Sequence, residues 1–302
     1  MKWLKGIGLF LIANFLIYLT LTFTANLLVN VILPVFGIDV RGVFNEQLLV
    51  WALVIGFGGA FISLAFSKQM ARAMLDCRQI TQPRSQAEQV IFGAVQDIAQ
   101  RLHITMPEVW VYDSPDPNAF ATGPSKNNSM VAVSTGLLQN LKEDEVKAVL
   151  AHEMGHVYNG DMFTTTVLAG LMNTFVYYIS NFLSQLVGHP QGDREDSGNP
   201  ILGFVVYIVL QVVLSFMAMI VVSWHSRRRE FGADAFSAKV YGKGAMISAL
   251  QSINRWVNRT QVDYGTQDPL ATFKISGKTS GVMHLFATHP PMEERIAALE
   301  RL

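Results

Sequence analysis

The chain has 302 residues, of which 50% are hydrophobic and only 15% are charged. Soluble domains carry about 25% charged residues. The mean hydropathy of +0.29 therefore argues against a single water-soluble globule and excludes a disordered chain. The 23 basic and 23 acidic residues give a formal net charge of zero, so we expect no nucleic-acid partner. The single cysteine, Cys77, excludes an internal disulfide framework and a cysteine-rich zinc cluster.

The apolar residues are concentrated in runs without a charged side chain, at residues 6–38, 47–67, 163–188 and 201–224. A helix needs about 20 apolar residues to cross the hydrocarbon core, so each run predicts a transmembrane helix, the first over about 6–33. That first run is too long for the ~7–15-residue core of a signal peptide. The third and fourth runs contain the amide side chains of Asn173, Asn181, Gln185 and Gln211. For these two runs, a buried helix or one that lines a polar cavity stays open.

Basic residues near the ends of the runs predict the orientation of the chain. They precede the first run and follow the second and fourth, at Lys2, Lys5, Lys68, Arg72, Arg78, Arg84, Arg227, Arg228 and Arg229. The segments 34–46 and 189–200 contain one basic residue each, Arg41 and Arg194. We therefore expect both termini, and the polar segments between the second and third runs and after the fourth, on the cytoplasmic side.

The expected organisation is a soluble domain interrupted by a pair of spans. Residues 1–67 and 163–224 each hold two transmembrane helices, and residues 68–162 and 225–302 form the two parts of one cytoplasmic domain. In its first part, periodicity and turn residues predict helices at 85–103, 135–141 and 144–160, strands at 108–112 and 130–133, and an extended edge segment at 118–123. The last of these helices is expected to run on toward the third span. The fold class is mainly α with a small β-sheet.

The helix at 144–160 contains the pattern His152-Glu153-Met154-Gly155-His156. Two histidines four residues apart lie on one helical face and can bind one zinc ion. Glu153 can reach a water at that metal and act as general base, as in the HExxH arrangement. The pattern has only three fixed positions and also occurs by chance on surface helices, so it needs support from elsewhere in the chain.

A catalytic zinc needs a third protein ligand. No histidine follows shortly after the motif, because Gly160 and Asp161 lead directly into the third span. Glu230, just after the fourth span, is the expected third ligand, and Asp234, four residues on, is expected to hold a zinc-ligating histidine. The alternative for Glu230 is a solvated acid beside three arginines.

Three motifs together resemble the HtpX membrane metalloproteases, which are relatives of the CAAX prenyl proteases. They are the HExxH pattern, the segment 226–234 around Glu230, and Thr288-His289-Pro290-Pro291 with Arg295. Asn118-Ala-Phe-Ala-Thr-Gly123 is also similar to the family's segment upstream of the zinc helix, and the likeness covers nearly the whole chain. The resemblance implies a gluzincin-like zinc endopeptidase of the bacterial inner membrane, linked to stress and quality control, with one zinc on His152, His156 and Glu230.

Other residues carry weaker predictions. His289 either stabilises the oxyanion or only packs at a helix start, and Asn118 either binds the substrate backbone or is a plain turn residue. The three arginines 227–229 either contact lipid headgroups, or one of them pairs with Asp234. His225 is the alternative third ligand, although an interfacial histidine is the simpler interpretation.

The chemistry expected from these residues is peptide hydrolysis of membrane proteins and unfolded polypeptides. Glu153 takes a proton from a water that zinc has acidified, and returns it to the leaving amine. The substrate is expected to add as a strand beside 118–122 or 130–133. A metal transporter is disfavoured because His152 precedes the apolar run, and a non-catalytic scaffold has no need for Glu153. A protease that processes prenylated proteins remains the alternative within the class.

Overall fold

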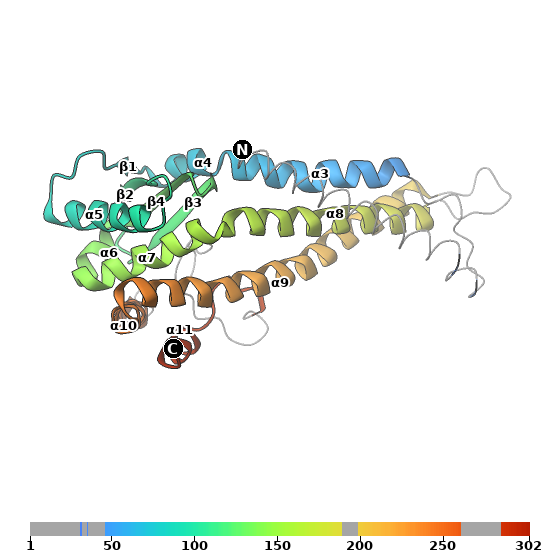
Figure 1. Ribbon diagram of the computed structural model, residues 1–302. Helices are drawn as coiled ribbons and strands as arrows, with labels where there is room; N and C mark the ends of the chain where they lie inside the picture. The colour runs from blue at the N-terminus through green and yellow to red at the C-terminus, as the bar shows by residue number, and fades with distance from the viewer. Residues whose placement is uncertain (1–30, 32–34, 36–45, 189–198, 261–284) are drawn as a thin grey trace. The chain divides into compact units, whose positions relative to one another are not determined.

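The computed structural model describes residues 31, 35, 46–188, 199–260 and 285–302 (Figure 1). Within this part of the chain, three helices are long and apolar enough to cross a membrane: α3 (Glu46–Ala65), α8 (Asp161–Gly188) and α9 (Pro200–Tyr241). They correspond to the second, third and fourth predicted spans. The first predicted span, at about 6–33, lies outside the described residues.

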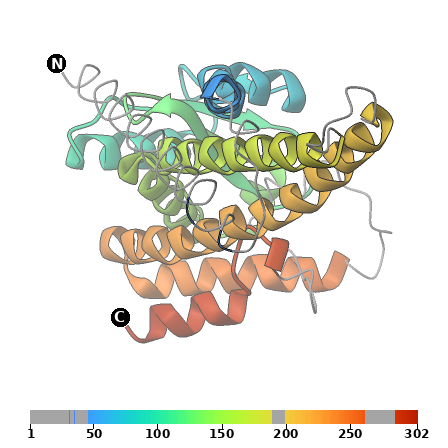
Figure 2. The same ribbon diagram turned by 90° about the vertical axis from the view of Figure 1, so that its right-hand side faces the viewer.

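The other described helices belong to the polar segments. They are α4 (Ser67–Leu75), α5 (Gln86–Arg101), α6 (Thr135–Asn140), α7 (Glu143–Asn159), α10 (Lys243–Thr260) and α11 (Met292–Glu300). Figure 2 shows α10 and α11 side by side, and the two helices are in contact. The prediction of a mainly helical fold with a small sheet is confirmed.

By its contacts the chain divides into two compact units. The described residues up to Phe61 form one unit with Val167–Met219, and those of Ile62–Thr166 form the other with Ile220–Leu302. In the first unit, α3 and α8 approach closely at glycines, since a Cβ atom on Gly56 would lie 2.3 Å from Thr174 Oγ1. Small residues are typical of helix contacts in membranes. Among the described residues, the most apolar 18-residue stretch of α9 contains no buried residue.

The second unit contains a four-stranded sheet in the order β1-β2-β4-β3. The strands are β1 (Arg78–Gln79), β2 (Glu108–Tyr112), β3 (Ala119–Ser125) and β4 (Asn128–Ser134). β2 and β4 are parallel, and the other two pairs are antiparallel. The predicted strands and the edge position of 118–123 are confirmed, whereas β1 was not predicted because two residues are too short for a periodic pattern. The alternative of a free edge at 130–133 is wrong, because β4 is paired on both sides, with β2 and β3.

Alternate residues of the sheet point to its two faces, as the period of a strand requires. On one face, side chains such as Val109, Val131 and Val133 belong to the main core with α5 and α7. On the other face, Tyr112, Phe120, Met130 and Ala132 form a smaller cluster with Ala71 of α4. The sheet is therefore covered by α5 and α7 on one side and by α4 on the other.

Candidate metal centre

α7 carries the HExxH residues in the interior of the second unit. His152 and Glu153 are buried, because α5, α10 and the sheet surround this helix. Gly155 lies between the two histidines, and a Cβ atom there would be only 3.2 Å from Phe236 and 3.3 Å from Ala233 Cα. The missing side chain thus lets α9 approach α7 closely where Glu230 is needed.

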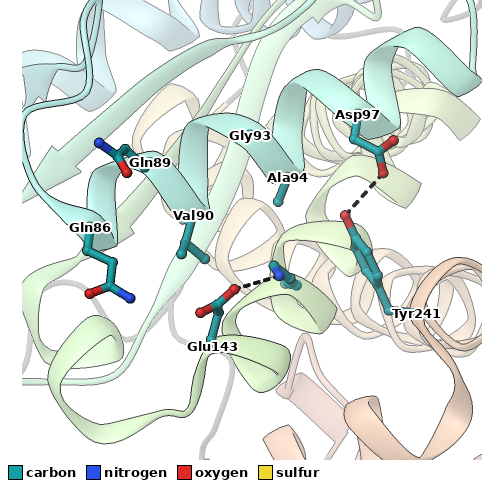
Figure 3. Close-up of a pocket in the computed structure, with 9 residues that line it drawn as sticks. Gln86, Gln89, Val90, Gly93, Ala94, Asp97, Glu143 and Tyr241 are labelled. Carbon is teal, nitrogen blue, oxygen red and sulfur yellow. Dashed lines mark hydrogen bonds and ion pairs between the residues drawn. The ribbon is translucent and has the colours of Figure 1, made fainter.

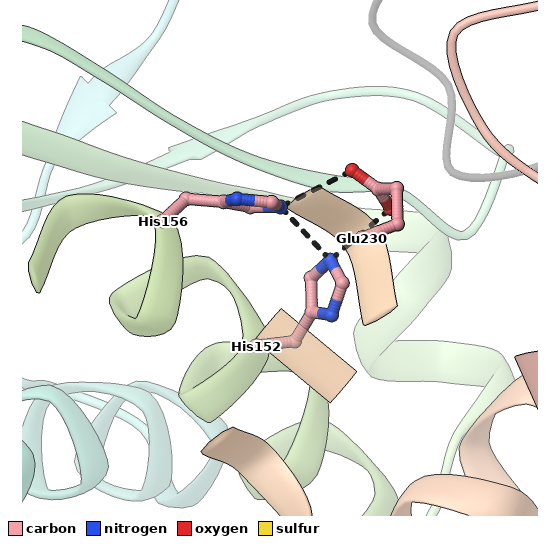
Figure 4. Close-up of side chains that lie close together, drawn as sticks. All are labelled: His152, His156 and Glu230. Atoms are coloured by element: carbon pink, nitrogen blue, oxygen red, sulfur yellow. Dashed lines mark hydrogen bonds and ion pairs between the residues drawn. The ribbon is translucent and has the colours of Figure 1, made fainter. Parts of the chain in front are cut away.

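Three ligand atoms converge at this contact (Figure 4). His152 Nε2 lies 3.2 Å from His156 Nε2, and Glu230 Oε1 lies 3.2 Å from His156 Nε2. Glu230 Oε2 lies 3.5 Å from His152 Nε2, and the ligand atoms of all three residues are within 4.8 Å of one another. Glu230 is only 2% exposed, so the alternative of a solvated acid is wrong.

The Nδ1 atom of each histidine, on the side of the ring away from the centre, lies within hydrogen-bond distance of a carboxylate. His152 Nδ1 lies 2.8 Å from Asp234 Oδ1, the partner predicted from the sequence, and His156 Nδ1 lies 2.6 Å from Asp161 Oδ2. A carboxylate only accepts hydrogen bonds, so each Nδ1–H donates, and in the neutral ring Nε2 is the nitrogen that can bind a metal. This arrangement sets the ring orientation and tautomer that a metal-ligating histidine needs.

Asp161 was not predicted as a partner, because the sequence pattern predicts that the helix continues through this point. Instead, α7 ends at Gly160, which adopts a left-handed conformation with φ of 72°. This break places Asp161, the first residue of α8, beside His156. The Arg229 guanidinium donates to the backbone carbonyl of Asp161 over 2.9 Å and holds the turn from the side of α9.

The residues present fit a divalent metal ion. The two imidazole Nε2 atoms and the Glu230 carboxylate converge within 4.8 Å of one another, so one cation can be bound by all three residues. Burial would raise the pKa of Glu230, but the nearby histidines, His289 first among them, hold it well below its usual range, so this carboxylate is ionised. Two histidines and one glutamate are a typical donor set for catalytic zinc.

Glu153 is next to the first ligand and is 6% exposed. Burial raises the pKa of its carboxyl group, against the opposing effect of His152 and His156. A carboxylate with a raised pKa is a better proton acceptor near neutral pH. Its position and environment are those of a general base.

Arg295 is a residue of the site to which the sequence analysis assigned no role. It lies on α11, has no exposed surface, and donates twice to Asp234, from Nε over 2.8 Å and from Nη2 over 2.6 Å. Burial would raise the pKa of Asp234, but Arg295 and His152 hold it well below the usual range. The alternative in which one of the arginines 227–229 pairs with Asp234 is wrong, because Arg295 is its partner. In the sequence, only the position of Arg295 six residues after His289 pointed to a role for this arginine at the site.

The arginines at 227–229 have structural partners. Arg227 donates to the carbonyls of Leu285 and Ala287, and the Ser223 hydroxyl donates to Phe286. These bonds anchor the segment that leads to His289. Arg228 lies over the ring of Trp224, 5.1 Å from its centroid.

His289 approaches the centre, and its Nδ1 lies 2.7 Å from Glu230 Oε2. Asn118 is buried just before β3, where its N–H donates to Ser134 Oγ over 2.9 Å. The roles in oxyanion and substrate binding remain predictions for both residues. His225 is not among the three residues whose ligand atoms converge.

A separate hollow of about 480 Å³ lies on the same unit (Figure 3). It is lined by Gln86, Gln89, Val90, Gly93, Ala94, Asp97, Glu143, Lys147 and Tyr241. The Tyr241 hydroxyl donates to Asp97 over 3.5 Å across it, and Lys147 pairs with Glu143. None of the converging ligands lines this hollow, so it is not the metal centre.

The apolar helices and the buried histidine–glutamate centre define this chain as a membrane metallopeptidase. The protein-family model described as "Peptidase family M48" matches residues 85–302 of the sequence. The chain belongs to this family. The resemblance seen in the sequence and the prediction of a metalloprotease are thereby confirmed. The alternative of a metal transporter is wrong.

The relatives extend over nearly the full chain. The chain is 43% identical over 287 residues to "Protease HtpX" of Pasteurella multocida, covering 95% of this chain and 97% of the relative. It is 44% identical over 301 residues to "Protease HtpX" of Idiomarina loihiensis, covering 99% of both chains. It is 41% identical over 301 residues to "Protease HtpX homolog" of Methylacidiphilum infernorum, again with 99% of both covered.

A solved structure shares the fold. The crystal structure of S. mikatae Ste24p matches 96% of this chain with a TM-score of 0.59 and 18% sequence identity. This chain spans 66% of the length of that protein. At this identity the likeness concerns the fold alone.

Proposed function

We propose that this membrane metallopeptidase is a zinc endopeptidase that cleaves misfolded or damaged membrane proteins on the cytoplasmic side of the bacterial inner membrane. The observation that carries the proposal is the convergence of His152 Nε2, His156 Nε2 and Glu230 within 4.8 Å, beside buried Glu153. His152, His156 and Glu230 bind one zinc ion, and Glu153 is the catalytic base.

The residues of the chain divide the chemistry among them. When bound, zinc supplies a Lewis acid that polarises the peptide carbonyl and acidifies water. Glu153 accepts the proton of the attacking water and returns it to the amine that leaves. Asp234 and Asp161 keep the Nδ1 protons of His152 and His156 in place, so that both Nε2 atoms stay available as ligands.

The substrate binds in an extended form beside β3. This strand is at the edge of the sheet, pairs with β4 on one side, and contacts α7, the helix of the HExxH residues. Addition of a strand reads the backbone more than the side chains, which suits a protease for unfolded or damaged polypeptides. Asn118 at the start of β3 takes part in holding the substrate backbone, and His289 supports the developing oxyanion.

The decisive experiment compares two glutamates of the same helix. Glu153→Gln keeps the metal ligands but removes the base, so casein cleavage by the purified protein in detergent should fall by the order of 10²–10⁴-fold. Metal analysis should give wild-type zinc content. Glu143→Gln, at the exposed start of α7, loses only a surface ion pair with Lys147 and should stay active. Wild-type cleavage by Glu153→Gln would refute the mechanism.

The orientation is tested by reporter fusions. From the basic residues after the second and fourth apolar runs we expect Leu302 in the cytoplasm and a reporter fused within 190–198 on the opposite side. A reporter that is active only in the periplasm should be silent at Leu302 and active within 190–198. Activity at Leu302 would contradict the cytoplasmic site while leaving the peptidase chemistry untouched.

A further inference from the structure

α4 has its charged and apolar faces in the reverse of the usual order. A surface helix of a soluble domain normally points charged residues outward and apolar residues inward. In α4 the outward face is made of Gln69, Met70, Ala73 and Met74, without a charge. Met70 is 49% exposed and Met74 is 56% exposed.

Both basic residues of α4 point to the protein instead. Lys68 Nζ lies 2.7 Å from Glu108 Oε1, and Arg72 pairs with the other oxygen of the same carboxylate. The Arg72 guanidinium also lies over the ring of Trp110, 4.6 Å from its centroid. The two basic side chains of α4 therefore pair with Glu108 of β2 instead of facing water. The face of α4 that points away from the sheet has no charged residue.

The exposed apolar face of α4 continues that of the preceding span. The Phe66 N–H donates to the Ile62 carbonyl over 3.0 Å, and the Met70 N–H donates to the Phe66 carbonyl over 2.9 Å. Helical hydrogen bonding thus passes through the boundary between α3 and α4. Ile62, Phe66, Met70 and Met74 form one stripe at four-residue steps, each about half exposed or more. Ile62 lies within the apolar window of α3, which ends at Ala65.

From this continuity we propose that α4 lies in the headgroup layer of the membrane, with Phe66, Met70 and Met74 in contact with lipid. At 1.5 Å per residue, Met70 is about 7 Å and Met74 about 14 Å beyond Ala65 along the helix. The headgroup layer of one leaflet is roughly 5–8 Å thick, and the tilt of a span, ~20° on average, shortens these heights only slightly, so Met70 lies within the layer and Met74 at its outer boundary. Met70 is therefore the deeper of the two.

This placement gives α4 a mechanical function. One face of the helix contacts lipid, and the other is tied to β2 through Glu108 and contacts β3. The sheet is thus held at the membrane surface, with the edge strand within reach of polypeptide segments that leave the bilayer. The placement of α4 stands without the proposed function, whereas this consequence for substrates rests on it.

The test measures what surrounds the stripe. In a Cys77→Ser background, Met70→Cys and Met74→Cys are spin-labelled one at a time and reconstituted in vesicles of phosphatidylethanolamine and phosphatidylglycerol. Collision rates with oxygen, which concentrates in lipid, and with a water-soluble nickel chelate are then compared. Val212→Cys on the exposed face of α9 is the lipid reference. Gln96→Cys on the exposed face of α5 is the water reference.

The oxygen-to-nickel ratio at Met70 should be severalfold above that of Gln96 and approach that of Val212, and the ratio at Met74 should lie between those of Met70 and Gln96. Ratios equal to that of Gln96 would overturn the proposal. Protection from nickel that appears only when casein is added would make the stripe a substrate surface. Spin–spin broadening that depends on the protein-to-lipid ratio would make it a contact between copies. Either result would also overturn it.

Discussion

The two histidines of the metal centre are oriented by different parts of the chain. His152 is held by Asp234, which lies 82 residues away on α9 and is in turn clamped by Arg295 of α11. His156 is held by Asp161, only five residues on, across the turn at Gly160. The first arrangement is entirely buried, whereas His156 and Asp161 keep 13% and 10% of their side chains exposed.

The difference teaches where the strength of each arrangement comes from. At His152, the helices α7, α9 and α11 meet in the buried interior. Removing one partner of a buried ion pair leaves the charge of the other without compensation. At His156, the partner follows from a local helix break, and water can replace part of a lost hydrogen bond. We therefore expect substitutions around His152 to cost more than those around His156.

The largest effect is expected at Glu230, whose carboxylate lies close to both histidines. We call the contacts of His152 with Asp234 and Arg295 the His152 branch, and the contact of His156 with Asp161 the His156 branch. Glu230→Ala removes the ligand that contacts both histidines, so zinc content and casein cleavage should fall together to background. Glu230→Asp should keep part of both, because the carboxylate remains but is one methylene short. Metal analysis of the purified protein measures the first quantity directly. Stoichiometric zinc at wild-type affinity in Glu230→Ala would show that the third ligand lies elsewhere, with His225 the first candidate.

Arg295→Met is expected to have the next largest effect. It leaves the buried Asp234 carboxylate without its cation, and breaking a buried pair by removing one partner costs about 3–5 kcal/mol. Thermal unfolding should shift to a clearly lower midpoint, and zinc affinity should fall with it. Arg295→Lys should recover the charge but not the paired hydrogen bonds. A wild-type midpoint for Arg295→Met would refute the clamp.

Asp234→Asn tests the contact between Asp234 and His152 with a smaller change in the shape of the side chain. The amide still fits the site, but its oxygen is a weaker acceptor for the His152 Nδ1 proton. Second-sphere substitutions of this kind cost about 10–100-fold in metal affinity or activity. Zinc affinity measured by competition with a chelator gives the value. An unchanged affinity would mean that the Nδ1 bond does not orient His152.

Asp161→Asn is the matched change in the His156 branch and should have the smallest effect. We expect a loss near the lower end of the same ~10–100-fold range, because the site is partly exposed. The comparison of the two asparagine variants is made in one chelator titration. A larger loss for Asp161→Asn than for Asp234→Asn would reverse the ranking of the two branches.

Local patterns were sufficient for much of the molecule. The short segments 108–112 and 130–133 predicted β2 and β4, the edge position of β3 was also anticipated, and the charge-free runs predicted α3, α8 and α9. The spacing of His152 and His156 placed both on one helical face, and the step from Glu230 to Asp234 predicted a ligand and its neighbour. These features depend on short local segments, on runs without charge and on a spacing of four residues along a helix, all of which a sequence displays directly.

Tertiary structure decided the rest. The clamp on Asp234 requires α11 to pack against α9, and nothing near Arg295 in the sequence distinguishes a buried guanidinium from a solvated one. The partner of His156 depended on Gly160, whose left-handed conformation ends α7 where the pattern predicted continuation. The reversed faces of α4 became visible only when Glu108 was found beside Lys68 and Arg72. In each case the decisive contact joins residues whose side chains meet only after packing, so no local period records it.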